Sequence, residues 1–142
     1  MYVVDASVWV SLLMPSDTNH PPSQLWMESV VERGEPIAGP AVVLAEVAGA
    51  IARRTGDGRR ALKGNTLLRS FPNFRLASVG EELAKLGAET AAQQKLRGVD
   101  ALYTALAERL GLILITWDEE QRARSRTIVE AFTPQEALAR AS

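Results

Sequence analysis

Short apolar runs alternate along this chain with segments of helical spacing, and this alternation restricts the possible folds more than any other feature. The purest run, Leu-Ile-Leu-Ile-Thr at residues 112–116, is typical of a strand buried on both faces, as in a parallel sheet. Weaker runs lie at residues 2–4, 37–40 and 74–77. Strands separated by helices predict right-handed βαβ units and therefore an α/β fold: a three-layer α/β/α sandwich with a mostly parallel central sheet of four or five strands.

Helices are expected between these runs. Their apolar spacing predicts helices over residues 8–15, 23–34, 41–52, 59–69, 81–96 and 100–110. Ser23 is the expected N-cap of the second helix, Ile128-Val129 the expected last strand, and Thr133 with Glu136 an expected capping box. No linker or repeat interrupts the pattern, so the sequence predicts one domain over residues 1–142.

Cysteine and histidine usage excludes several classes of enzyme. The chain has no cysteine and one histidine, His20, so it offers no thiolate nucleophile, no disulfide framework and no zinc site built on cysteine or on two histidines. We see neither a basic leader nor an apolar stretch of about 18 residues, which predicts a soluble, cytoplasmic protein without a membrane span. Carboxylates remain as the plentiful reactive side chains.

Four acidic residues fall where an α/β sandwich gathers its functional side chains, at strand ends and helix starts. Asp5 ends the first run and Asp118 follows the run at 112–116, whereas Asp100 begins a helix. Glu46 projects from a helix face that is otherwise small or apolar. Plainer explanations exist: Asp5 and Asp118 fit helix N-caps, Asp100 fits a helix dipole, and Glu46 fits a narrow exposed edge.

Gathered carboxylates have a chemical consequence. They repel and raise one another's pKa unless a cation lies between them, and oxygen ligands of this kind suit Mg²⁺ or Mn²⁺. Such an ion lowers the pKa of a water molecule and neutralises charge on a phosphodiester under in-line attack, so no histidine is needed. The acids therefore predict metal-assisted hydrolysis.

Three stretches of the sequence resemble a known family: VVDASVWV at the start, PAVVLAEVAGAIA around Glu46, and GVDALYTALAERLGLILITWDEE from Gly98 onward. Over roughly residues 1–129 the chain resembles PIN-domain ribonucleases, most of all the VapC-like toxins of type II toxin–antitoxin modules. The resemblance implies a PIN-like fold, cleavage of RNA as an endoribonuclease, and one or two bound Mg²⁺ or Mn²⁺ ions. It also implies a cognate antitoxin as partner and a homodimer.

The resemblance assigns roles residue by residue. The acids that hold the metal and cleave RNA in that family correspond to Asp5, Glu46, Asp100 and Asp118. The small hydroxyls that orient the cluster correspond to Ser7 and Thr116. After Asp118 the chain has Glu119-Glu120 where the family usually has a further aspartate, and of these two Glu120 is the better candidate for a fifth ligand.

A basic segment contrasts with the overall charge of −1. Residues 51–75 contain seven arginines and lysines against Asp57 alone, and a break near Gly56 predicts a basic helical hairpin there. Beside an acidic site on an RNA-cleaving enzyme, such a segment is expected to bind phosphates through Arg53, Arg54, Arg59, Arg60 and Lys63. A solvated helical face is the alternative.

Other interpretations stay open. A catalytically silent PIN-fold module would bind RNA or a protein without cleaving RNA, although retention of all four acids argues against it. A haloacid-dehalogenase-like phosphatase would have a second aspartate where this chain has Ser7. Trp9, Trp26 and Met14 are either core residues or apolar surface for contacts with a second copy or an antitoxin.

Overall fold

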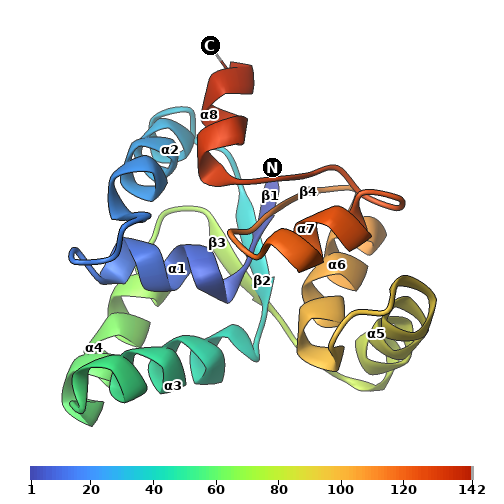
Figure 1. Ribbon diagram of the computed structural model, residues 1–142, viewed down its shortest axis with the longest axis horizontal. Helices are drawn as coiled ribbons and strands as arrows, with labels where there is room; N and C mark the ends of the chain where they lie inside the picture. Colours follow the sequence, from blue (N-terminus) through green and yellow to red (C-terminus); the bar gives the residue numbers. More distant parts are fainter. Residues whose placement is uncertain (142) are drawn as a thin grey trace.

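A five-stranded parallel sheet forms the centre of the molecule. The computed structural model describes residues 1–141, and its strands are β1 (Tyr2–Val4), β2 (Ile37–Pro40), β3 (Phe74–Ala77), β4 (Ile113–Ile115) and β5 (Ala131–Phe132) (Figure 1). Their spatial order is β3-β2-β1-β4-β5, and every pairing is parallel. The predicted parallel sheet is confirmed.

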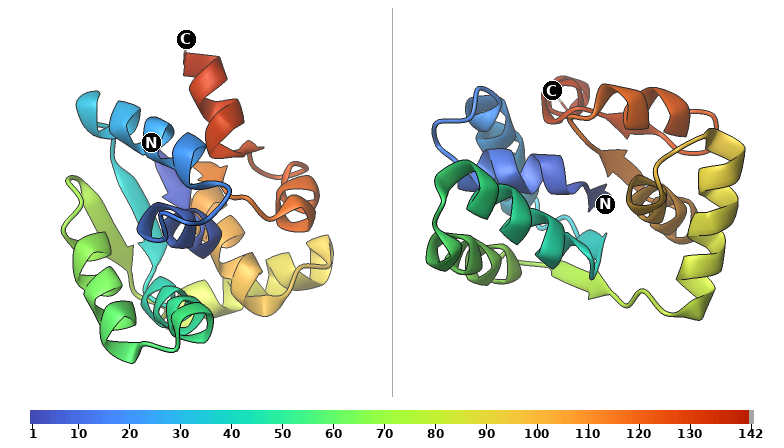
Figure 2. Two further views of the ribbon diagram at one scale, coloured as in Figure 1. Left: turned by 60° about the vertical axis from the view of Figure 1, so that its left-hand side comes forward. Right: turned by 60° about the horizontal axis from the view of Figure 1, so that its bottom comes forward.

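Helices cover both faces of this sheet, which confirms the three-layer sandwich. They are α1 (Ala6–Leu13), α2 (His20–Glu32), α3 (Val43–Thr55), α4 (Gly58–Arg69), α5 (Glu81–Gln94), α6 (Gly98–Leu110), α7 (Glu119–Ser125) and α8 (Pro134–Ala141). Helices α1 to α4 lie on one side and α5 to α7 on the other, with α6 against β1, β2 and β4 (Figures 1 and 2). Right-handed crossovers explain this division, because the chain moves from β1 toward β3 and then returns past β1 to β4.

The core lies around β1, β4 and helix α1. Trp9 and Trp26 have 0% exposed surface, and Met14 is 6% exposed. The Trp9 ring packs edge-on against Phe71 and Phe74, with ring centroids 5.1 and 5.2 Å away. Trp9, Trp26 and Met14 are therefore core residues, and the interpretation that they form surface for partner contacts is wrong.

The start of α2 differs from the prediction. The helix begins at His20, because Pro21 and Pro22 occupy its first turn, where a fixed φ and a missing N–H are tolerated. Ser23 is therefore not the N-cap: it is buried inside the helix, with its Oγ 2.7 Å from Ser11 Oγ. Gly34, at the end of the predicted range, follows the helix with φ 64°, a left-handed conformation that favours glycine after a helix C-terminus.

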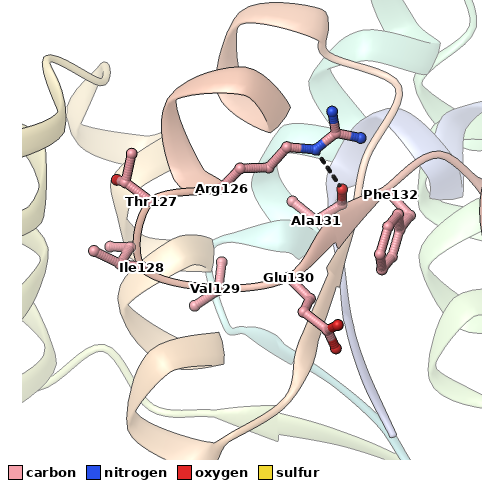
Figure 3. Close-up of a pocket in the computed structure, with 7 residues that line it drawn as sticks. All are labelled: Arg126, Thr127, Ile128, Val129, Glu130, Ala131 and Phe132. Atoms are coloured by element: carbon pink, nitrogen blue, oxygen red, sulfur yellow. Dashed lines mark hydrogen bonds between the residues drawn. The ribbon is translucent and has the colours of Figure 1, made fainter.

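The last strand also differs from the prediction. The amides of Ile128 and Val129 both donate to Ser125 O at 3.0 Å, which closes a turn and leaves β5 to begin at Ala131. Residues 126–132 line a pocket of about 440 Å³ beside this turn, and Arg126 Nε donates across it to Ala131 O (Figure 3). Most of the residues that line this pocket precede β5 in the chain. The pocket therefore lies at the amino ends of the strands, away from the acids that follow β1 and β4.

The predicted hairpin and capping box are both present. Helix α3 continues through Arg54 to Thr55, and the break is confined to Gly56 and Asp57, shorter than the sequence predicts. The Asp57 side chain caps α4 by accepting from Arg60 N at 3.1 Å. At the start of α8, Thr133 and Glu136 exchange two hydrogen bonds of 3.0 Å, as the capping box requires. No helix within residues 1–141 is both long enough and apolar enough to cross a membrane.

Candidate active site

The carboxyl ends of β1 and β4 bring Asp5 and Asp118 to one edge of the sheet. These strands are neighbours, with Val4 opposite Ile115, and Asp5 N donates to Ile115 O at 2.9 Å. The direction of the strand order changes here, and ligands of α/β proteins bind in the crevice at such a switch point. The predicted placement of these two acids is confirmed.

Asp5 is almost completely buried, at 5% exposure, and it is held through one of its two oxygens. Oδ2 accepts hydrogen bonds from Ser7 N at 3.1 Å, Ser7 Oγ at 2.6 Å and Thr116 Oγ1 at 3.0 Å. All three bonds go to the same oxygen, so Asp5 can cap α1 with Oδ2 while Oδ1 remains for another ligand. Burial raises the pKa of Asp5, and the bonds from Ser7 and Thr116 oppose that rise.

Ser7 and Thr116 form a hydroxyl pair that joins α1 to the end of β4. Their oxygens lie 3.3 Å apart. While donating to Asp5, Ser7 Oγ accepts from Trp117 N and Thr116 Oγ1 accepts from Asp118 N, each at 3.0 Å. One hydroxyl pair thus fixes both Asp5 and the backbone that carries Asp118. That it orients a catalytic cluster stays a prediction.

Glu46 faces the site from α3 and is held by a tyrosine of α6. Tyr103 OH donates to Glu46 Oε1 at 2.5 Å, and Tyr103 has no exposed surface. Partial burial raises the pKa of Glu46, the Tyr103 bond opposes this, and the nearby charges of Asp5 and Asp100 raise it further. The plain interpretation of Glu46 as a solvated edge residue is therefore wrong.

Arg97 joins the remaining two acids. Its Nε donates to Asp100 Oδ2 at 2.9 Å, and its Nη2 donates to Asp118 Oδ2 at 3.2 Å. Burial raises the pKa of Asp100, Arg97 opposes that rise, and the charges of Asp118 and Glu120 add to it. Asp5, Glu46 and Asp118 each interact electrostatically with Asp100, so all four predicted acids lie at one edge of the sheet.

Asp118 also caps α7, as its plainer explanation predicts. Its Oδ1 accepts from Gln121 N at 2.9 Å. The Gln121 side chain does not return this bond as it would in a capping box: it turns inward, and its Nε2 donates to Asp100 O at 3.3 Å. Gln121 is 1% exposed and so links the start of α7 to α6 beneath the acids.

Glu120 lies in the first turn of α7 but points to another partner. Its Oε1 pairs with Arg124 at 2.8 Å, and its side chain is 64% exposed. It lies close enough to influence Asp100 and Arg97 electrostatically. Its role as a fifth ligand stays a prediction, and Glu119 beside it is exposed.

The donor set suits a hard divalent cation. Four carboxylates lie at this edge on different segments of the chain, Asp5 keeps one oxygen free of the capping bonds, and the charges of Asp5, Glu46 and Asp100 repel one another. Within residues 1–141 no three such side chains are grouped closely enough to hold an ion as they stand. The positive charge between Asp100 and Asp118 is instead the guanidinium of Arg97. That the four acids share one ion stays a prediction.

The basic side chains lie on the hairpin of α3 and α4, and all five of the predicted ones are exposed: Arg53, Arg54, Arg59, Arg60 and Lys63. Glu46 is near the start of α3 and Arg53 is two turns later, a distance of about 10 Å along the helix axis. The turn between the helices lies at the far end of α3 from the sheet (Figure 1). Arg54 Nη1 donates to Asp17 Oδ2 at 2.7 Å, so Arg54 is less available than the other four side chains for contacts with RNA.

The sequence interpretation missed Arg97 and Tyr103 as site residues. Both lie three positions from Asp100, one on each side, and one helical turn is the spacing at which side chains share a helix face. That spacing was the available signal. Their partners, Asp118 and Glu46, come from other elements and cannot be read from local pattern.

Comparison with known protein families identifies the family to which this chain belongs. The family model described as PIN domain matches residues 2–126. The chain belongs to the PIN domain family. The match includes every predicted site residue, and it confirms both the resemblance inferred from the sequence and the class of protein, a nuclease domain.

Several solved structures share this fold. VapC20 of Mycobacterium tuberculosis, described as a sarcin-ricin loop cleaving toxin, is 22% identical with TM-score 0.71 over 87% of this chain and 94% of that chain. FitAcB of Neisseria gonorrhoeae is also 22% identical, with TM-score 0.71 over 94% and 98%. A toxin–antitoxin complex from Klebsiella pneumoniae is 19% identical, with TM-score 0.65 over 94% and 98%. At these identities the likeness shows a shared fold. A comparison with curated proteins gives no match.

Proposed function

We propose that this PIN domain is a metal-dependent endoribonuclease that hydrolyses RNA phosphodiesters as the toxin of a toxin–antitoxin pair. One observation carries the proposal: a PIN-family chain keeps four acids at the carboxyl edge of β1 and β4, with their carboxylates held by hydroxyls, a phenol and a guanidinium. The structural likeness to VapC20 and to the toxin–antitoxin complex from Klebsiella pneumoniae supports the toxin role. A silent binding module would have no use for buried like charges that cost free energy to gather.

Asp5, Glu46, Asp100 and Asp118 would hold Mg²⁺ or Mn²⁺. When bound, the ion would supply an activated water and neutralise charge on the phosphodiester oxygens. The chain's own part is positioning. Ser7 and Thr116 fix Asp5 by donating to one oxygen, and Tyr103 fixes Glu46 in the same way. Such support orients ligand oxygens and keeps their rotamers from adjusting at each turnover.

RNA would reach the acids along the basic hairpin. Exposed Arg59, Arg60 and Lys63 on α4, with Arg53 on α3, attract phosphates, whereas the acids themselves repel them. Since Glu46 and Arg53 lie on one helix, a strand bound at the hairpin is led back toward the site along α3. This arrangement supports the proposed RNA contacts.

An antitoxin and a second copy of the chain are the proposed protein partners. Support comes from the shared fold with a toxin–antitoxin complex and from a pocket of about 490 Å³ between α1 and α2, lined by Leu12, Leu13 and Met27 among others. Exposed Leu25 and Val31 lie on the same helix α2. Light scattering that gives only a 15.4 kDa species at micromolar concentration would count against the homodimer.

The test of function is cleavage of total RNA with Mg²⁺ or Mn²⁺, with and without a chelator. We expect a defined set of cut sites that disappears when the metal is removed and returns when it is restored. A small phosphomonoester run beside the RNA distinguishes the phosphatase alternative, which would release phosphate from it. RNA binding without any cleavage would support the silent module.

A second expectation concerns pH. The pKa values of Asp5, Glu46 and Asp100 are raised above 3.8, 4.5 and 3.8, and a metal requires these groups ionised. Mn²⁺ affinity should therefore rise, with proton release, as pH climbs from these ordinary carboxyl values through the raised ones. Without metal the sign is reversed for stability, because carboxyls with a raised folded pKa destabilise the fold as pH climbs from their ordinary values through the raised ones.

Calorimetric titration of Mn²⁺ in buffers of different ionisation enthalpy measures the released protons, and urea unfolding of the metal-free protein measures the stability. Equal Mn²⁺ affinity across this range, together with no proton release, would contradict the raised pKa values.

A further inference from the structure

One guanidinium lies across two of the acids that the proposed function assigns to the metal. Arg97 contacts Asp100 of α6 through Nε and Asp118, at the start of α7, through Nη2, and in each acid it engages Oδ2. The other oxygen of Asp118 is already used by the α7 cap. Arg97 thus occupies the oxygen of Asp118 that the backbone leaves available.

The helix does not explain this position of Arg97. Arg97 immediately precedes α6, and a cation at a helix N-terminus opposes the helix dipole. Its side chain makes no capping hydrogen bond and is 77% exposed, so water could solvate it fully. It nevertheless folds back onto two carboxylates from different elements. Their combined negative charge is the interaction that holds it there.

We propose that Arg97 is a built-in cation that holds Asp100 and Asp118 in the metal-free protein and competes with the divalent metal for them. This inference rests on the proposed function, since it takes both acids as ligands. Without a cation between them, Asp100 and Asp118 would repel each other and separate. A divalent ion and a guanidinium cannot share the same carboxylate oxygens, because the two cations repel. Metal binding through the Oδ2 atoms of Asp100 and Asp118 therefore requires Arg97 to leave.

An ordinary surface ion pair would behave differently. Exposed pairs contribute little, and their loss leaves distant properties unchanged. A pair of this kind lies near the other end of α6, where Arg109 Nη2 contacts Glu82 of α5 at 3.3 Å in an exposed position. Arg109 is therefore a matched control. It lies at the opposite end of α6 from Arg97 and carries the same charge, but its partner is not a predicted ligand.

The through-space effect of the Arg97 charge on metal affinity must also be distinguished from direct competition for the carboxylates. When any nearby positive charge is removed, the site attracts a metal ion more strongly, whether or not that charge was in contact with the ligands. Arg97→Lys keeps the charge but loses the planar fork that reaches two carboxylates at once. Competition predicts that Arg97→Lys binds metal more tightly than the wild type does, whereas a through-space effect predicts equal affinity.

The experiment is a calorimetric titration of the metal-free protein with Mn²⁺. We expect Arg97→Gln to tighten binding about five- to tenfold, Arg97→Lys about two- to threefold, and Arg109→Gln not at all. Thermal unfolding without metal should show a lower Tm for Arg97→Gln than for Arg109→Gln, because Asp100 and Asp118 then face each other unpaired.

The outcomes separate the inference from the function on which it rests. Mn²⁺ binding by the wild type with equal or weaker binding by Arg97→Gln would overturn the competition and leave the proposed function intact. Tighter binding by Arg97→Gln with wild-type affinity in Arg97→Lys would also overturn it, in favour of a through-space charge effect. No Mn²⁺ binding by any variant would overturn the proposed function, and the inference with it.

Discussion

Asp100→Asn should lower the single-turnover rate of RNA cleavage by at least about 10²- to 10³-fold while RNA affinity stays the same or rises. The amide keeps the size of the carboxylate and can still accept from Arg97, so the local fold should persist. It removes the negative charge that a divalent ion needs from this half-buried position. It also removes a charge that repels the RNA backbone, which is why binding is expected to hold or improve.

Two other variants make this result specific. Glu108→Gln removes an exposed acid from the same helix α6 and should leave cleavage unchanged. Arg59→Ala/Arg60→Ala removes two exposed charges of the hairpin and should weaken RNA binding, with a salt dependence shallower by about one counterion per charge removed. Binding is measured across a salt series and cleavage in single turnovers on the same RNA.

The acid and arginine variants should fail in opposite ways. Cleavage by Asp100→Asn at the wild-type rate would show that Asp100 is not catalytic. Unchanged affinity and salt slope in Arg59→Ala/Arg60→Ala would show that the hairpin is a solvated face, as the alternative interpretation holds.

The sequence pattern predicted the sheet because a short local run of apolar residues indicates each strand. The run at 112–116 indicated burial on both faces, and the consecutive residues Leu114 and Ile115 of β4, whose side chains point to opposite faces, both have 0% exposed surface. The acids at strand ends followed from topology, since parallel neighbours place their carboxyl ends together. For Asp5 and Asp118 the capping and ligand interpretations are compatible, because each carboxylate has two oxygens and the cap uses one.

Contacts between elements could not be predicted in the same way. The apolar spacing of α6 favours Leu110 as core, but Leu110 is 50% exposed, whereas Tyr103 and Thr104 are fully buried. Helix α6 packs between the sheet and α5, so it buries two faces, and a one-sided helical pattern does not describe it. Tyr103 and Arg97 therefore became visible as site residues only when α3 and α7 were placed beside α6.

The largest stability effect is expected at Trp9, which sequence alone left open between core and surface. Trp9→Ala should lower the free energy of unfolding by about 3–5 kcal/mol, the usual cost of removing a buried aromatic side chain and leaving a cavity. The Trp9 ring is fully buried, and its removal eliminates the edge-on contacts to Phe71 and Phe74, which lie in the segment between α4 and α5. The measurement is urea unfolding followed by circular dichroism, because the substitution removes a fluorophore.

Leu25→Ala is the matched control for this prediction. Leu25 is an apolar residue of α2 that is 57% exposed, and its loss should change the free energy of unfolding by less than about 0.5 kcal/mol. If Trp9 instead formed an interface between copies, Trp9→Ala would lower the mass seen by light scattering and leave the monomer stable. Because Asp5 is the N-cap of α1 and Trp9 lies one turn later, a cavity at Trp9 should also loosen the cap at Asp5 and weaken Mn²⁺ binding. Loss of stability with unchanged Mn²⁺ affinity would show that the hydroxyl pair holds Asp5 independently of the core beneath it.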